Sequence, residues 1–217
     1  MIELRWTVVA DGTSDRVLIP ILDWLLQEQG IAEAESMWAD FSKMSIPPKS
    51  LKARVEEALK QYPCDLLFIH RDAEREPYNL RKREIIQVVE SLEAKPLAVC
   101  VVPVRMQEAW LLLSERAIRF AASNPNGRKS LDIPPIKDLE AKPDPKHILY
   151  DLILAASELK GRRLKTFRQS QLRQAPHLIA QYIYEHEGFA ALRSLSAFAA
   201  LEADIQAIIA EQSWNIE

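Results

Sequence analysis

The sequence lacks the cysteine content of a disulfide-stabilised or zinc-knuckle protein. Only two of its 217 residues are cysteines, Cys64 and Cys100, and each lies in an apolar run. Two thiols at this spacing suit neither a metal knuckle nor a disulfide scaffold. They predict a protein of a reducing compartment, which we take to be the cytoplasm.

Long apolar runs and phosphate-binding glycine loops are also absent. No run approaches the ~18 apolar residues that a membrane span needs, and the N-terminus does not resemble a signal peptide. Gly12 makes no phosphate loop, because no Gly-rich or Walker-type pattern surrounds it. No serine or cysteine lies in a nucleophile-elbow or triad context. These absences argue against a membrane protein, a P-loop ATPase and a serine or cysteine hydrolase.

The bulk composition is that of an ordinary globular protein, with 48% hydrophobic and 27% charged residues. A formal net charge of −3 weakens the case for a protein that coats DNA. A local basic patch can nevertheless bind phosphates.

The first hundred residues alternate between strand and helix patterns. Extended, β-rich runs cover residues 4–10, 36–41, 64–70 and 97–104, and helical spacing of apolar residues fills the segments between them. The run over 64–70 is almost continuously apolar, which is typical of a strand buried on both faces. The alternation predicts an α/β fold with a Rossmann-like parallel sheet and helices on both faces.

A proline-rich segment divides the chain. Five prolines between residues 125 and 145 leave no room for a long regular element. We therefore predict a linker over 123–145. It would separate an α/β domain over 1–122 from a helical C-terminal extension over 146–217, packed on the first domain.

Acidic residues follow three of the predicted strands. Asp11 comes after the first strand, Asp72 and Glu74 after the third, and Glu108 shortly after the fourth. Ligands of open parallel sheets bind outside the carboxyl ends of the strands. Mg²⁺ prefers oxygen ligands, and one or two carboxylates with substrate phosphates complete its shell. The cluster therefore predicts a cation site at this edge.

Each of these acids also has a simpler explanation when taken alone. Asp11 suits the turn before a helix, and Asp72 suits a turn after a strand. Glu74 suits the first turn of a helix, where the macrodipole favours acids, and Glu108 suits an exposed first-turn position. Their convergence on one sheet edge favours a real site.

Basic residues offer candidate phosphate contacts. Arg71 and Arg105 flank the acidic cluster and could either clamp a phosphate or form structural ion pairs. Arg162, Arg163 and Lys165 belong to a cationic run over 161–173 that contains no acid. This run could line a nucleic-acid track, although a solvated helix end and loop explains it equally well.

Five segments resemble motifs or segments of a known family. Residues 8–15, VVADGTSD, resemble the first TOPRIM motif, in which a strand ends in an acid followed by glycine. Residues 70–74, HRDAE, resemble the second motif, an acid-x-acid pair after a buried strand. Residues 103–112, PVRMQEAWLL, look like a Glu-Ala-Trp-Leu segment found in uncharacterised TOPRIM-like bacterial proteins related to the nuclease domains of phage-defence systems. Residues 144–149 and 194–198 also look like segments of that group.

The resemblance implies a TOPRIM fold, bound Mg²⁺ (or Mn²⁺) and phosphoryl transfer on nucleic acid. It implies that Asp11 is a general acid or base, that Asp72 and Glu74 are metal ligands, and that Glu108 is a further catalytic acid. Two positions depart from the pattern. Asp11 is one methylene shorter than the usual glutamate, and His70 replaces the first acid of the pair, which suits Mn²⁺ or Zn²⁺ better than Mg²⁺.

Two functional hypotheses follow. The first is a Mg²⁺-dependent nuclease of TOPRIM type that acts on DNA or RNA in defence or repair. The second is a catalytically degenerate, partner-binding component of a defence complex. The partner would be, for example, an ATPase encoded alongside. Dependence on a partner is plausible under either hypothesis, because this chain has no ATP-binding motif of its own.

Overall fold

The computed structural model describes residues 4–31 and 33–214. The chain divides into two compact units. The first comprises Met1–Val102 with Ala199–Glu217, and the second comprises Pro103–Phe198. This boundary lies about 20 residues before the expected one at residue 122. Compact units defined by packing need not fold independently, so the division into domains stays a prediction.

The first unit is built on a parallel sheet, as predicted. Its described strands are β1 (Leu4–Val9), β2 (Ala34–Trp38), β3 (Leu66–His70) and β4 (Ala98–Val101), in the order β2-β1-β3-β4. The α/β class and the parallel sheet are therefore confirmed. β4 is shorter than the expected run to residue 104, because Pro103 has no N–H to donate to a neighbouring strand.

Helices connect these strands. They are α1 (Leu18–Glu28, preceded by the 3₁₀ helix η1, Thr13–Val17), α2 (Leu51–Gln61) and α3 (Tyr78–Glu90). The Ser50 hydroxyl caps α2 by accepting the Ala53 N–H at 3.2 Å. Gly30, with φ of 86°, ends the segment after α1, as its position in the sequence predicts.

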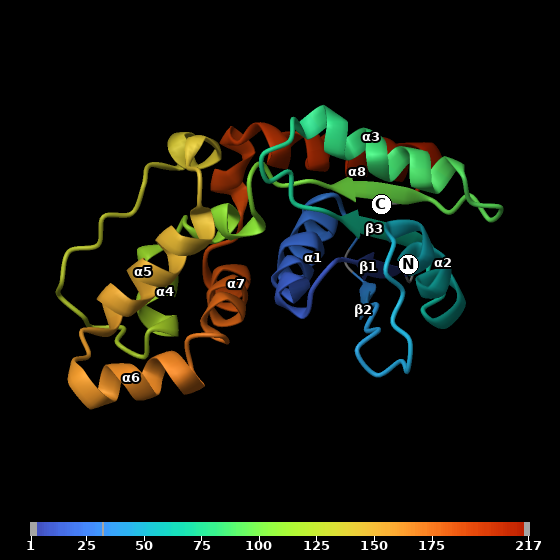
Figure 1. Cartoon of the computed structure of the whole chain (residues 1–217). Helices are drawn as coiled ribbons and strands as arrows, with labels where there is room; N and C mark the ends of the chain where they lie inside the picture. Colours follow the sequence, from blue (N-terminus) through green and yellow to red (C-terminus); the bar gives the residue numbers. More distant parts are fainter. Residues whose placement is uncertain (1–3, 32, 215–217) are drawn as a thin grey trace. The chain divides into compact units, whose positions relative to one another are not determined.

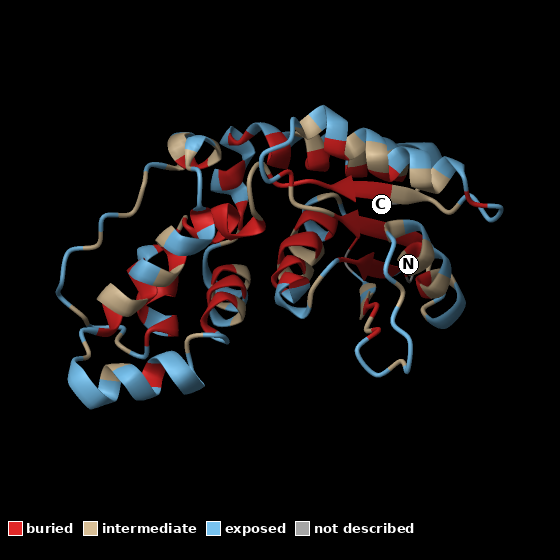
Figure 2. Cartoon of the chain, in the orientation of Figure 1, coloured by how far each residue is buried: buried red, intermediate tan, exposed pale blue. Residues whose placement is uncertain are grey.

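The two faces of the sheet are covered by different helices. On one face, strand residues such as Leu67 and Ile69 pack with Val55 of α2 and Ile85 of α3. On the other face Trp6 and Phe68 are fully buried and pack edge to face, with ring centroids 5.2 Å apart. The α1 carboxyl of Asp23 interacts with this Trp6, which places α1 on that second face. Figures 1 and 2 show the buried strands between these helices.

The last helix, α8 (Ser196–Gln212), contributes most of its length to the first unit. Lys82 Nζ of α3 lies 2.6 Å from Asp204 Oδ2, and the Gln29 amide donates to Glu202 Oε1 at 3.3 Å. These contacts tie α8 to α3 and to the end of α1. The sequence had placed this segment in the helical extension, because contacts between residues more than 100 positions apart leave no local pattern.

The second unit is helical. Its longer helices are α4 (Glu115–Ala121), α5 (Pro145–Ser157), α6 (Gly161–Ser170) and α7 (Ala175–His186), with the 3₁₀ helices η2 (Gln107–Leu111), η3 (Ile136–Ala141) and η4 (Ala190–Ser194). Trp110 and Phe198 pack edge to face in its core, 5.4 Å apart. Across the described part of the chain, every helix is too short or too polar to cross a membrane.

A candidate site at the carboxyl edge of the sheet

The strand order creates a switch point between β1 and β3. From β1 the chain crosses through α1 to β2 on one side, and α2 then carries it over the opposite face to β3 on the other side. Connections that leave in opposite directions open a crevice at the carboxyl ends of the two strands. Asp11 follows β1, and Arg71 and Asp72 follow β3 directly. The sequence-predicted acids of the first unit therefore stand at the position where this fold class places ligands.

Asp11 lies between two arginines. Its Oδ2 is 3.6 Å from Arg71 Nε and its Oδ1 is 4.0 Å from Arg54 Nη1. The Asp11 side chain is nevertheless 59% exposed, so a ligand can reach it. Arg54 Nη1 also donates to the backbone carbonyls of Ala10 and Asp11, at 2.7 and 2.9 Å. Arg54 therefore fixes the end of β1.

The ion pairs continue onto α3. Glu84 Oε2 accepts Arg71 Nη1 at 3.2 Å and Arg81 Nη1 at 2.7 Å. Asp11, Arg71, Glu84 and Arg81 thus alternate in charge across the edge of the sheet. The Asp11–Arg71 and Arg71–Glu84 pairs are partly exposed, and such pairs contribute about 0–1 kcal/mol each to stability, so this row of ion pairs serves mainly to orient its members. Of the two alternatives for Arg71, the structural ion pair is observed, and the phosphate clamp stays a prediction.

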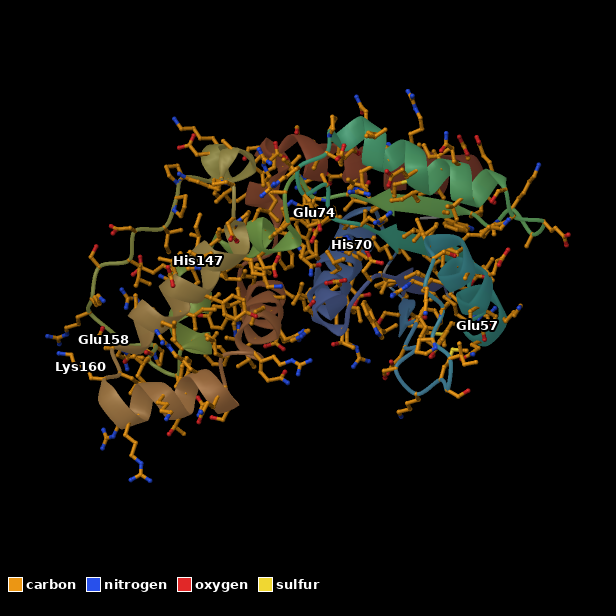
Figure 3. All side chains as sticks on the ribbon, in the orientation of Figure 1. Glu57, His70, Glu74, His147, Glu158 and Lys160 are labelled. Carbon is orange, nitrogen blue, oxygen red and sulfur yellow. The ribbon has the colours of Figure 1, made fainter. Side chains whose placement is uncertain are left out.

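His70, labelled in Figure 3, is buried at the end of β3. Its Nδ1 lies 3.0 Å from the carbonyl oxygen of Val101. Since a carbonyl can only accept, Nδ1 carries the hydrogen. In the neutral ring Nε2 then presents a lone pair, 3.6 Å from Asp72 Oδ1. An imidazole nitrogen beside a carboxylate is a combination that would suit Mn²⁺ or Zn²⁺ better than Mg²⁺.

Asp72 and Glu74 leave β3 in a tight turn. The Asp72 side chain is 26% exposed, and Glu74 is exposed with a left-handed φ of 54°. The Glu76 N–H closes the turn on the carbonyl of Ala73 at 2.9 Å. A left-handed backbone at a residue other than glycine costs on the order of 1 kcal/mol. The turn holds both carboxylates in the loop at the edge of the sheet.

These acids do not form a ready-made metal cage. Among the residues that the structure describes, no three His, Cys, Asp or Glu side chains are grouped so that they could hold a metal ion. One or two carboxylates, completed by water and substrate phosphate, are the usual protein share of a Mg²⁺ site. A Mg²⁺ ion held by Asp72 and Glu74 would therefore need water and substrate phosphate for the rest of its shell.

The turn after Asp11 contains a residue that sequence reasoning missed. The buried Asp15 accepts the Gly12 N–H at 3.0 Å and the Ser14 hydroxyl at 3.0 Å. An acid three residues after a helix start is the pattern that could have revealed this cap. Gly12 itself has an ordinary φ of −139°, and an added Cβ would meet its nearest neighbour at 3.5 Å. The backbone therefore does not require glycine here.

Glu108 and Arg105 belong to the second unit. Glu108 is only 5% exposed, and its Oε1 lies 3.3 Å from Lys146 Nζ of α5. The alternative explanation of Glu108 as an exposed first-turn acid is therefore wrong, because all five residues of η2 are buried. Arg105 has a left-handed φ of 66°. The catalytic role of Glu108 stays a prediction.

The cationic run forms α6. Arg162, Arg163 and Lys165 are exposed on this helix, which lies in the second unit. The helix replaces the expected helix end and loop over most of the run. None of the three side chains belongs to the row of ion pairs in the first unit.

Asp23 is a second carboxyl that sequence reasoning missed. It lies on α1, and burial raises the pKa of its carboxyl to about 6. Interaction with the Trp6 indole opposes this shift only in part, and Nε1 of Trp6 has no hydrogen-bond partner of normal geometry among the described residues. The position of Asp23 inside a helix gave no indication in the sequence that its carboxyl is buried.

Comparison with known proteins gave no match to this chain among protein-family models, curated proteins or solved structures.

Proposed function

We propose that the first unit carries a Mg²⁺-dependent (or Mn²⁺-dependent) phosphoryl-transfer site of TOPRIM type, which hydrolyses DNA or RNA. The observation that carries the proposal is the meeting of Asp11 with the loop after β3, where Arg71 Nε lies 3.6 Å from Asp11 Oδ2. The two segments that most resemble TOPRIM motifs thus follow the carboxyl ends of two neighbouring strands, where this fold class binds ligands. A setting in phage defence or repair is supported by the sequence resemblance alone.

Each residue of the proposed site would have a distinct role. Asp72 and Glu74 would hold the ion together with phosphate oxygens, and the ion would supply charge stabilisation at the phosphoryl group. Asp11, the more exposed acid, would take or give the proton of the attacking or leaving oxygen. Arg71, already oriented by Glu84, adds a positive charge where an incoming phosphate must pass.

Asp11 is shorter than the glutamate that is usual in the motif, and its contacts with Arg54 affect how far its carboxylate can reach. Arg54 holds the backbone of Asp11 through two carbonyls. That grip limits how far the carboxylate can move toward a substrate. We therefore expect slow hydrolysis, and Asp11→Glu should speed it up if reach limits the rate.

The test is metal-dependent hydrolysis of labelled single- and double-stranded DNA and RNA. Asp72→Asn should abolish cleavage, while Glu76→Gln, an exposed acid in the same loop, should leave it unchanged. Far-UV circular dichroism would show that both variants remain folded. Equal cleavage by the wild type and Asp72→Asn would refute the proposal.

A second candidate function is favoured by one observation. Asp11 already has two cationic neighbours, as expected of a site that has lost its metal and become structural. The chain would then be a partner-binding component, for example of an ATPase. Recovery of such an ATPase with the native protein, together with no metal affinity, would favour this alternative. Metal-dependent cleavage by the isolated chain would exclude it.

A further inference from the structure

A pocket of about 580 Å³ lies wholly within the second unit. Its walls are the ends of α4 and α5 and one face of α6 (Figure 1 shows α6 beside these ends). Small-molecule sites in proteins span roughly 300–1,000 Å³, so the pocket has the size for a ligand such as a nucleotide. Since every lining residue belongs to the second unit, this inference is independent of the proposed function.

The charged residues that line the pocket are all basic. Arg162 and Arg163 line it, and no aspartate or glutamate does. Within residues 4–31 and 33–214, neither arginine forms an ion pair, whereas Arg71, Arg81 and Arg119 each do. An exposed guanidinium that lacks an acidic partner retains its full capacity for a bidentate anion. Both guanidinium groups are therefore available to an anionic ligand of the pocket.

The remaining lining is partly apolar. Ala122 and Phe167 are buried, and Leu159 is half-buried, so they provide an apolar wall. Ser123 and Gln171 add neutral polar side chains. A simple inorganic anion would leave this wall unused, whereas a ligand with an apolar ring system would cover it.

We propose that this pocket binds a phosphorylated small molecule with an apolar ring system, the class to which mononucleotides belong. A terminal phosphate carries a charge of about −1.5 to −2 at neutral pH, which matches two guanidinium groups better than the single charge of a carboxylate does. The ring system would lie against Phe167 and Leu159, and its polar groups would reach Ser123 and Gln171.

The test is calorimetric titration of the full chain with AMP, with inorganic phosphate and adenosine as separate probes. We expect saturable binding of AMP, and weaker binding of each separate part. Arg162→Gln and Arg163→Gln should each weaken AMP binding at least tenfold. Arg168→Gln is the matched control, because Arg168 is exposed on the same helix and does not line the pocket.

Three outcomes would overturn the inference. The first is no saturable binding of AMP by the wild type at millimolar concentration. The second is an equal loss with Arg168→Gln, which would indicate general attraction to a basic helix. The third is inorganic phosphate binding as tightly as AMP, which would leave the apolar wall without a role. Thermal unfolding of each variant would confirm that the exposed substitutions leave the fold intact.

Discussion

Asp23 gives the most quantitative test of the fold. Burial raises the pKa of its carboxyl from 3.8 to about 6. A folded-state pKa above the unfolded value means that the folded protein binds the proton more tightly between those two pH values. Stability contributed by this group is therefore present below about pH 4 and is lost as the pH rises toward 6. At 1.36 kcal/mol per pKa unit, the ionised carboxylate costs the folded state at most about 3 kcal/mol above pH 6, and solvent screening of this half-buried group lowers that cost.

Asp23→Asn should remove this cost without changing the size of the side chain. We expect the variant to be more stable than the wild type by up to about 3 kcal/mol at pH 7.5, and nearly equal to it at pH 4. Urea denaturation at both pH values measures the difference, and the comparison at each pH cancels the titration of all other groups.

Asp40→Asn is the opposite control. Hydrogen bonds from Ser42, from its side chain and its backbone, lower the pKa of the exposed Asp40 carboxyl. Its stabilisation is present at neutral pH and is lost as the pH falls, so this variant should lose stability at pH 7.5 and none at low pH. A difference between Asp23→Asn and the wild type that does not change with pH would refute the reasoning for Asp23.

Three further predictions concern local packing and reactivity. Ser50→Ala should lower the free energy of unfolding by about 1 kcal/mol in urea titrations, because the Ala53 N–H loses its cap. Gly127→Ala should lower the melting temperature, since an added Cβ would lie 2.5–2.8 Å from side-chain atoms of three neighbours, whereas Gly12→Ala should leave it unchanged. Burial raises the pKa of the Cys100 thiol to about 11. Cys100 should therefore react with a disulfide reagent at pH 8 only after the protein unfolds. Equal reaction rates of Cys100 in the folded and unfolded protein would contradict its burial.

Much of the first unit's fold could be predicted from the sequence. The continuous apolar run before His70 predicted β3, and the helical spacing between strands predicted α1, α2 and α3. These are local patterns, which the sequence displays directly. The position of α8 could not be predicted, because Lys82 and Asp204 are 122 residues apart.

The candidate site was predictable only in part. The placement of acids after strand ends indicated Asp11 and Asp72, but the sequence does not show that β1 and β3 are neighbours. The contribution of Arg54 was also hidden, since which face of α2 meets the end of β1 depends on tertiary packing. Glu108 is buried because the whole of η2 is buried. The residues around Glu108 in the sequence did not indicate this.

The proposed function requires that a divalent cation bind together with phosphate at the carboxyl ends of β1 and β3. The most direct measurement is calorimetric titration of Mn²⁺ into the full chain in the presence of a short single-stranded oligonucleotide. The wild type and Glu76→Gln should bind the ion equally, and Asp72→Asn should bind it at least tenfold more weakly. Equal affinity in all three proteins, or no binding by the wild type with the oligonucleotide present, would contradict the account.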